Sequence, residues 1–350
     1  MKPIQDTRLY LEIHQQPDII RKLVVDPQDS IKALADRIKA KGIHHVIIAA
    51  RGTSDNAGRY AQYLLGAHNQ LSVGLTTPSL FTIYNQPPNL SDSLVIGISQ
   101  SGKSPDIVSV LEEGHRQGAL TAAITNYPDS DLGNAADIVL DLNAGEELSL
   151  AATKTYTAQL TLLALLSAEL NPTDTFKKDL LALPDQINQG YENESVVKSL
   201  AERYRYMSYC AVIGRGLNYA TAFELSLKIK ELTYTVAEPY SSADFLHGPV
   251  AIIDRGFPTF VIAPSGKMLP EMKTLIEKVR DRQAEVIVIS DQDEFLALGD
   301  QKISLPKGVP EWLSPITAIP PGQMFAMYLS HTRGINVDNP RGLSKVTETW

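Results

Sequence analysis

The chain has 350 residues, 43% hydrophobic and 21% charged, a balance typical of a globular protein with two domains. Its net charge of −8 disfavours a nucleic-acid surface, and no lysine- and arginine-rich run offsets it. The N-terminus lacks the apolar core of a signal peptide, and no apolar stretch is long enough to span a bilayer. We expect a cytoplasmic protein whose single cysteine, Cys210, is a buried side chain rather than a nucleophile.

Short apolar runs alternate with helix-sized segments along the chain. Strands are expected at 45–50, 94–98, 120–124, 138–142, 210–213, 259–263, 285–289 and 302–305. Helices are expected, among others, at 56–65, 105–117, 220–236 and 270–282. This alternation predicts an α/β fold in which parallel sheets carry helices on both faces.

The two halves of the chain match each other at one constant spacing. Four features of the first half recur in the same order and at the same offset in the second: Arg51-Gly52 as Arg215-Gly216, Ser101-Gly102-Lys103 as Ser265-Gly266-Lys267, Glu147 as Glu311, and Gln159 as Gln323. Ordered matches at one offset indicate a tandem duplication, the alternative being coincidence among common residue types. We predict an N-terminal helical arm and two domains followed by a tail, with boundaries at 1–30, 31–195, 196–335 and 336–350.

Residues 97–104, Gly-Ile-Ser-Gln-Ser-Gly-Lys-Ser, match the phosphate-loop pattern of nucleotide hydrolases. In the second half Gly97 is replaced by Val261 inside an apolar run, so we expect Gly97 to lie in a strand. The remaining loop, 99–104, is too short to wrap a nucleotide, but its hydroxyl and amide groups can bind a small phosphate. A nucleotide site would also need a metal-holding acid at a strand end. Three aspartates follow apolar runs, so that alternative stays open.

A second loop, Arg51-Gly52-Thr53-Ser54, follows the first expected strand. Pro105 and Asp106 suit the first turn of a helix, where free N–H groups and the helix dipole favour an anion. Because the carboxyl ends of parallel strands meet at one edge, both loops are expected to converge on one phosphate. The alternative is that these serines only cap helices. The seven histidines are scattered, and we predict no metal site and no cofactor.

The segments 51–54, 99–102 and 151–154 resemble the signature loops of the sugar isomerase (SIS) domain family. Over nearly its full length the chain is similar to the isomerase half of the glutamine:fructose-6-phosphate amidotransferases. The further matching segments are 12–17, 227–231, 246–249 and 337–345. The resemblance implies two tandem SIS domains, each a parallel sheet between layers of helices.

The resemblance also implies roles for particular residues. The family's phosphate- and sugar-binding positions fall on Thr53, Ser54, Ser99, Gln100, Ser101, Ser104, Ala151, Glu224 and Ser344. Its proton-shuttling carboxylate falls on Glu231, with Lys228 a further active-site position. Its ring-opening histidine falls on His247, which the neighbouring subunit of a homodimer would supply. The lysine that contacts the sugar carbonyl, and can condense with it, falls on Lys345.

The residue types suit this chemistry. Glu224, Lys228 and Glu231 share one helix face by their spacing, and a carboxylate can move a proton between adjacent carbons. Histidine can open a sugar ring near neutral pH, and an amine can polarise a carbonyl or form an imine. The plainer alternatives are a solvated salt-bridge face, a turn histidine and a surface lysine.

Two departures from the family pattern bear on the substrate. No cysteine precedes Cys210, so we expect no glutaminase activity, and Lys103 stands where the family usually has an acid. We predict an amino-sugar phosphate isomerase/deaminase that converts glucosamine 6-phosphate to fructose 6-phosphate and ammonia. The alternatives are another phosphosugar isomerase, a fructosamine-6-phosphate deglycase, or a non-catalytic sugar-phosphate-binding regulatory protein.

Overall fold

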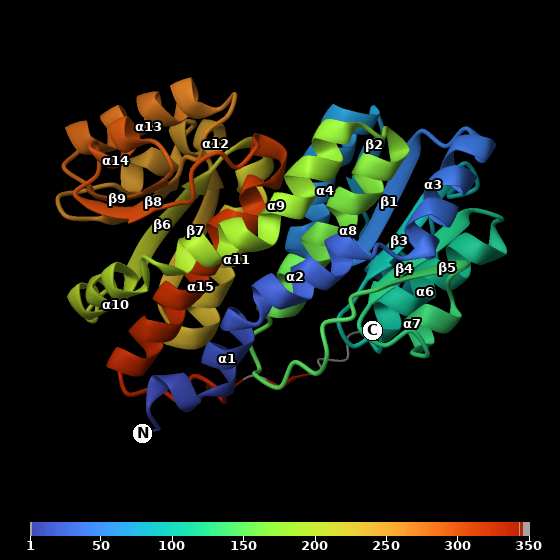
Figure 1. Ribbon diagram of the computed structural model, residues 1–350, viewed down its shortest axis with the longest axis horizontal. Helices are drawn as coiled ribbons and strands as arrows, with labels where there is room; N and C mark the ends of the chain where they lie inside the picture. Colours follow the sequence, from blue (N-terminus) through green and yellow to red (C-terminus); the bar gives the residue numbers. More distant parts are fainter. Residues whose placement is uncertain (1, 343, 346–350) are drawn as a thin grey trace. The chain divides into compact units, whose positions relative to one another are not determined.

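The computed structural model describes residues 2–342, 344 and 345 (Figure 1). The described chain divides into two compact units, and each is described by itself. Unit 1 comprises residues within 1–17, 148–153 and 182–343, and unit 2 comprises residues within 18–147, 154–181 and 344–350. The domain boundaries predicted above remain predictions, and residues 343 and 346–350 of the expected tail lie outside the described residues.

Unit 2 contains a five-stranded parallel sheet in the order β2-β1-β3-β4-β5. Its strands are β1 (His45–Ala50), β2 (Ser72–Leu75), β3 (Ser93–Ile98), β4 (Leu120–Thr125) and β5 (Ile138–Asp141). Helices α3 (Asp29–Lys41), α4 (Gly52–Asn69) and α8 (Lys154–Leu170) pack together, and α6 (Pro105–Arg116) packs with α5 (Ser79–Thr82) and α7 (Asp131–Asn134). Helices α2 (Gln16–Val25) and α9 (Asp174–Tyr191) pass from one unit to the other.

Unit 1 contains a second five-stranded parallel sheet, in the order β10-β9-β8-β6-β7. Its strands are β6 (Tyr209–Gly214), β7 (Val236–Ser241), β8 (Pro258–Ile262), β9 (Glu285–Ser290) and β10 (Gln301–Ser304). Helices α10 (Glu194–Arg203), α11 (Tyr219–Thr233) and α15 (Ser314–Thr332) pack together, with α1 (Arg8–His14) against α15. The other helices are α12 (Ser242–Leu246), α13 (Leu269–Asp281) and α14 (Asp293–Leu296), with short 3-10 turns η1 (Ile4–Asp6), η2 (Gly216–Asn218), η3 (Pro249–Ile252) and η4 (Glu311–Leu313).

The two sheets have the same strand order, which confirms the tandem duplication. Strands β6 and β7 follow β1 and β2 at the same offset that separates the matching sequence features. Helix α13 follows α6 at that offset as well. The predicted α/β fold of two tandem parallel sheets with flanking helices is therefore confirmed.

The central strands agree with their sequence predictions, whereas the edge strands β2 and β7 were not predicted. Every residue of β3 and β4 is buried, which explains their continuous apolar runs. Strand β7 contains Glu238 and Pro239, and proline is tolerated there because an edge strand leaves N–H groups unpaired. The helix predicted to reach Val236 was wrong at its end: α11 stops at Thr233 because Tyr234 adopts a left-handed conformation, with φ at 57°.

Gly97 lies inside β3, as predicted, paired with Ala49 of β1 and Ala123 of β4. A Cβ atom there would lie 2.7 Å from Cδ1 of Leu111 and 2.7 Å from Cδ1 of Leu132. The glycine therefore allows α6 and α7 to pack closely against the sheet. It does not begin a phosphate loop, and this removes the geometric basis of the nucleotide-hydrolase alternative.

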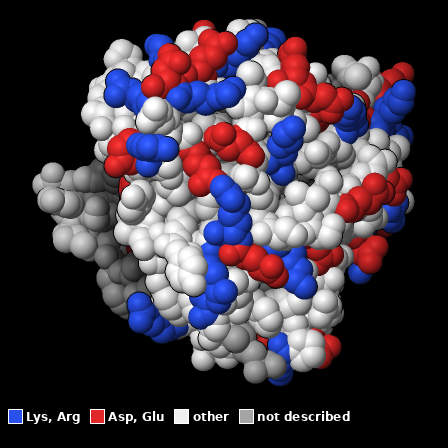
Figure 2. All heavy atoms as spheres, turned by 90° about the vertical axis from the view of Figure 1, so that its left-hand side faces the viewer, with Lys and Arg blue, Asp and Glu red and all other residues white. Residues whose placement is uncertain are grey.

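The surface and the single cysteine agree with the composition. Figure 2 shows one face on which basic and acidic side chains are interspersed rather than gathered into a single-sign patch. Within the described part of the chain, no helix combines the length and the apolarity that a membrane crossing requires. Cys210 is buried, as predicted, with 2% of its surface exposed.

Candidate functional site

Two polar loops of unit 2 follow the neighbouring parallel strands β1 and β3, which are in register up to Ala50 and Ile98. The first loop leads into α4, whose N-cap is Arg51, and the second leads into α6, whose N-cap is Ser104. An ion pair joins them, because Arg51 Nε lies 2.9 Å from Oδ2 of the fully buried Asp106 in the first turn of α6. The two loops therefore lie next to each other, as predicted, and their convergence on one phosphate stays a prediction.

The serine loop, residues 99–104, is anchored to the strand beside it. The backbone N–H of Ser99 donates to the carbonyl of Ile124, and the N–H of Asn126 donates to the carbonyl of Gln100. Gly102 adopts φ of 64°, and a Cβ there would lie 1.9 Å from Oγ of Ser130, so only glycine fits. The loop is therefore held to β4 and to the segment that follows it by backbone hydrogen bonds.

The side chains of the serine loop are partly occupied by its own backbone. Oγ of Ser99 accepts the N–H of Gly102 at 3.2 Å, and Oγ of Ser101 accepts the N–H of Lys103 at 3.3 Å. Ser104 caps α6 by backbone conformation only, since its side chain makes no capping hydrogen bond. The capping-only alternative therefore does not account for Ser104. Lys103 is exposed at the rim of the loop.

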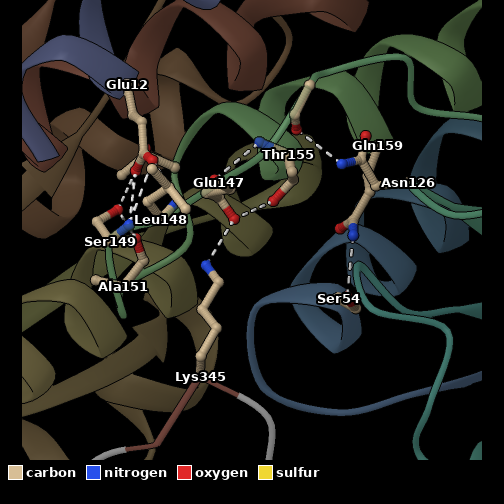
Figure 3. Close-up of polar contacts among 12 residues, drawn as sticks. Glu12, Ser54, Asn126, Glu147, Leu148, Ser149, Ala151, Thr155, Gln159 and Lys345 are labelled. Atoms are coloured by element: carbon tan, nitrogen blue, oxygen red, sulfur yellow. Dashed lines mark hydrogen bonds and ion pairs between the residues drawn. The ribbon is translucent and has the colours of Figure 1, made fainter. Parts of the chain in front are cut away.

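The first loop places Ser54 in the opening turn of α4. Its side chain is buried, and Oγ accepts a hydrogen bond from Nε2 of Gln159 on α8 at 3.0 Å (Figure 3). Thr53 is half-buried beside it. The sequence marks Gln159 as a repeat position only; the signal for a role in the site is its polar side chain in the middle of an apolar helix.

Lys345 forms an ion pair within unit 2. Its Nζ lies 3.3 Å from Oε2 of Glu147, whose side chain is fully buried (Figure 3). Glu147 also accepts the N–H of Thr155 at 3.2 Å and the hydroxyl of Thr155 at 2.7 Å. Lys345 is thus held at a defined place rather than being a free surface lysine, and its neighbour Ser344 is exposed. Glu147 was not among the predicted site residues.

The segment that carries Ala151 is fixed within unit 1 by the N-terminal arm. The buried carboxylate of Glu12 on α1 accepts hydrogen bonds from the N–H of Leu148 and from the N–H and hydroxyl of Ser149 (Figure 3). Oγ of Ser149 in turn donates to the carbonyl of Ala151 at 3.1 Å. The match at 12–17 included Glu12, but nothing in the sequence indicated its contact with a segment so far along the chain.

Three charged residues of α11 interact on one helix face, as their spacing predicts. Nζ of Lys228 lies 3.4 Å from Oε1 of Glu224 and 2.6 Å from Oε2 of Glu231. Glu224 is 0% exposed and Lys228 is 1% exposed, so a solvated salt-bridge face is excluded for both. Glu231 is 22% exposed. Among the described residues, no donor to Oε1 of Glu231 is found.

This arrangement leaves one carboxylate available for chemistry. A buried ammonium is tolerable only when it is paired, and Lys228 is paired twice. Two carboxylates and one ammonium leave one formal negative charge on the triad if all three are ionised. The carboxylate nearest to solvent is Glu231, which is held at one oxygen and open at the other.

His247 ends the short helix α12 in unit 1, and its side chain is exposed. Its backbone N–H donates to the carbonyl of Asp244 at 3.1 Å. For the ring itself, no hydrogen bond or ion pair is found with any residue that the structure describes. The ring is therefore accessible from outside this chain.

The first part of the tail is bound within unit 1. Asp338 accepts the N–H groups of Arg8 and Leu9 at the start of α1, at 3.1 and 3.0 Å. The N–H of Arg341 donates to Oη of Tyr234 at 2.7 Å, and its guanidinium lies 4.2 Å from the centre of that ring. Tyr234 is the residue that ends α11, so the tail is tied to the helix that carries Glu231.

The corresponding loop of unit 1 is closed by its own carboxylates. Asp291 accepts the N–H of Ser265 at 2.6 Å and also its hydroxyl, and Glu311 accepts the N–H of Lys267 at 2.9 Å. The cavity at this loop has a volume of about 10 Å³ and is lined by Arg215, Met268 and Glu311, among others. An anion would meet two negative charges here, so only the unit 2 loop is suited to phosphate.

No metal site is evident in the described part of the chain. Among residues 2–342, 344 and 345, no three histidine, cysteine or acidic side chains are grouped closely enough to hold an ion. A cavity of about 840 Å³ in unit 2 is lined by residues of α3, α8 and α9 and by none of the serine loop.

Comparison with known proteins agrees with this architecture. The family model for the SIS domain matches residues 41–168 and 210–330, that is, both halves of the duplication. The glutamine–fructose-6-phosphate aminotransferase (isomerizing) of Thermococcus kodakarensis is 32% identical over 343 residues, covering 95% of this chain and 56% of the relative. The enzyme of the same name from Escherichia coli K12 is 33% identical over 352 residues, covering 95% of this chain and 57% of that relative.

Among solved structures, the C-terminal domain of glucosamine-fructose-6-phosphate aminotransferase from Francisella tularensis is similar to the chain with a TM-score of 0.86. The two are 25% identical, and the match covers 96% of this chain and 98% of that domain. The chain thus spans little more than half the length of the curated relatives it matches. Because one family model matches both halves and both halves have the same strand order, the chain belongs to the SIS domain family.

Proposed function

We propose that this chain is a phosphosugar isomerase that deaminates glucosamine 6-phosphate to fructose 6-phosphate. The observation that carries the proposal is the α11 triad, in which a half-buried Glu231 is held by the buried ammonium of Lys228. A carboxylate fixed at one oxygen and open at the other suits a base that moves a proton between neighbouring carbons. The relatives named above, which act on fructose 6-phosphate by name, support a hexose 6-phosphate as substrate.

The proposed reaction assigns one step to each group. The serine loop and the start of α4 bind the phosphate through Thr53, Ser54, Ser99, Gln100, Ser101 and Ser104. His247 protonates the ring oxygen and takes the proton of the C1 hydroxyl, which opens the ring. Glu231 then carries the proton from C2 to C1, and the C2 amine becomes an imine.

Hydrolysis of that imine completes the reaction. Water adds at C2, the carbon–nitrogen bond breaks, and ammonia leaves, so one water is consumed and no electrons are exchanged. Lys345 contacts the carbonyl of the open-chain sugar. Glu224 and Lys228 keep Glu231 in place, and Ala151 and Ser344 line the sugar. The deaminating direction needs only water as co-substrate, and for that reason we favour it.

We also propose that the chain acts as a homodimer in which His247 belongs to the neighbouring subunit's site, and that it works in the cytoplasm. The exposed ring of His247, which has no polar partner among the described residues, supports a role outside its own chain. The family resemblance of the 246–249 segment supports the same role.

The test is turnover by the purified full chain. Glucosamine 6-phosphate in D₂O should yield fructose 6-phosphate, one ammonia per sugar, and deuterium at C1 introduced by exchange at Glu231. E231Q should abolish turnover while inorganic phosphate still binds. Turnover of glucose 6-phosphate alone would reduce the function to plain isomerisation. Binding without turnover of any hexose 6-phosphate would leave a regulatory sugar-phosphate-binding protein.

A further inference from the structure

We propose that Glu147 is a positioning residue for Lys345, which it holds where the amine meets the sugar carbonyl. The inference rests on the role given to Lys345 in the proposed function and adds a residue that the family resemblance did not supply. Glu147 and Lys345 both belong to unit 2.

Glu147 is positioned independently of the tail. Both of its carboxylate oxygens are bound by Thr155, one by the N–H and the other by the hydroxyl, at 3.2 and 2.7 Å. Thr155 lies in the first turn of α8, a 17-residue helix, where an anionic group is favoured by the helix dipole. The carboxylate is therefore a preorganised, fully buried negative charge.

Lys345 is the adaptable partner of this pair. Its side chain has four rotatable bonds, and about 2 kcal/mol of rotamer entropy opposes fixing it in one place. The ion pair, 3.3 Å from Nζ to Oε2, offsets that cost, and the lysine side chain as a whole remains 27% exposed. A buried carboxylate loses much of its desolvation penalty when it gains a counter-charge. The same contact therefore stabilises the carboxylate and places the amine.

Comparison with the second repeat shows that Glu147 has a different set of contacts from its repeat counterpart, which closes a loop. Glu311, the repeat counterpart of Glu147, accepts the backbone N–H of Lys267 in its own loop at 2.9 Å. In unit 2 the equivalent N–H, that of Lys103, is bound by Oγ of Ser101 instead. The carboxylate of Glu147 contacts Thr155 and Lys345 (Figure 3).

The chemical consequence concerns imine formation between Lys345 and the open-chain ketose. The nitrogen–carbon bond forms as the carbonyl π bond breaks. Of the three ammonium protons one stays on the iminium nitrogen, and two leave with the oxygen as water. Holding Nζ in place shortens the search for the attack geometry, and this raises the rate of the step without changing phosphate binding.

The experiment traps this imine in the full chain with fructose 6-phosphate and borohydride, which supplies the hydride, and measures the mass added at Lys345. E147Q, which keeps the shape and loses the charge, should lower the trapping rate and kcat about tenfold, the effect of losing one coupled pair. KM and the affinity for inorganic phosphate should stay within about twofold. E147D should restore part of the rate, and E311Q, the matched change in the other repeat, should leave it unchanged.

A double variant separates positioning from a general structural role. E147Q added to K345A should lower the remaining activity no further, because both changes remove the same contact. The inference would be overturned if E147Q lowered activity by the same factor in the wild-type chain and in K345A. It would also be overturned if E147Q trapped the imine at the wild-type rate. If E147Q does not fold, unchanged trapping by E147D, whose carboxylate is displaced by one methylene, overturns it. Full activity of K345A would instead refute the proposed role of the lysine itself.

Discussion

Gly97 and Gly102 occupy the two glycine positions of one phosphate-loop pattern, but they have different structural roles. Gly102 lies in the loop with φ of 64°, where L-residues are strained and where Ser130 leaves no room for a side chain. Gly97 lies in β3 and makes room for Leu111 and Leu132. The phosphate-loop pattern therefore does not distinguish a glycine that is required for core packing from one that is required by the conformation of the proposed binding loop.

The variant G97A tests this distinction. An added methyl group 2.7 Å from two leucine carbons should overpack the core and lower the free energy of unfolding by about 1–3 kcal/mol. Phosphate affinity should stay within about twofold, because the loop begins beyond the strand. Urea denaturation measures the first quantity and calorimetric titration with inorganic phosphate the second. Unchanged stability together with lost phosphate binding would return Gly97 to the binding loop.

The buried thiol of Cys210 should make the stability of the fold depend on pH in the alkaline range. Burial raises the pKa of its thiol from about 9 to about 12, so the folded state favours the protonated thiol. The contribution to stability is complete below pH 9 and is lost as the pH rises from 9 towards 12. An aromatic disulfide reagent at pH 8 should modify the thiol only after unfolding in urea. The variant C210A should lose this part of the alkaline pH dependence, and rapid labelling of the native chain would contradict the prediction.

On one face of helix α11, Lys228 contributes mainly to the stability of the fold, whereas Glu231 is proposed to act on the substrate. Variants of these two residues should therefore have different effects on unfolding and on turnover. K228M leaves Glu224 buried without its ammonium and should cost about 3–5 kcal/mol of unfolding free energy. E231Q keeps a hydrogen-bond acceptor for Lys228, whose ammonium stays paired with Glu224, so it should lower the free energy of unfolding less than K228M does while abolishing turnover. Denaturation midpoints and activity are measured on both. A large stability loss in E231Q would make Glu231 a structural residue.

The serine loop of unit 2 and the corresponding loop of unit 1, which contains Ser265, allow a matched comparison within one chain. S101A should weaken the binding of inorganic phosphate about tenfold, whereas S265A should leave it unchanged, since Asp291 already accepts both donors of Ser265. Calorimetric titration should give one phosphate site per chain. Two sites of similar affinity would mean that the carboxylates of the second loop yield to an external anion.

At the scale of the whole molecule, the proposed reaction needs residues from both repeats and, by the family resemblance, from two chains. H247A and E231Q should each be inactive. Refolded together, they should recover about a quarter of wild-type activity, because half of the dimers are mixed and each mixed dimer has one intact site of two. Activity is assayed after co-refolding at equal concentrations, with each variant refolded alone as the control. No recovery, with mixed dimers demonstrated, would place His247 in its own chain's site.

The α/β class, the duplication and the central strands could all be predicted from the order of the residues. Buried parallel strands require continuous apolar runs, and a duplicated fold keeps its landmarks at one spacing. The sequence did not predict two of the edge strands: β2, which is short and only partly buried, and β7, which contains Glu238 and Pro239. It placed Glu224, Lys228 and Glu231 on one face, since helical spacing is a local rule.

Which of these charges are buried became clear from the packing of the folded chain. The fold also revealed partners of predicted site residues, or of the segments that carry them: Glu12, Glu147, Gln159 and Asp106. These contacts join residues 55 to 198 positions apart, and local periodicity carries no information about partners so far along the chain. Glu147 and Glu311 occupy the same repeat position, yet one pairs with a lysine of the tail and the other closes its own loop. Identical residues acquire different functions when the chain brings different partners to them.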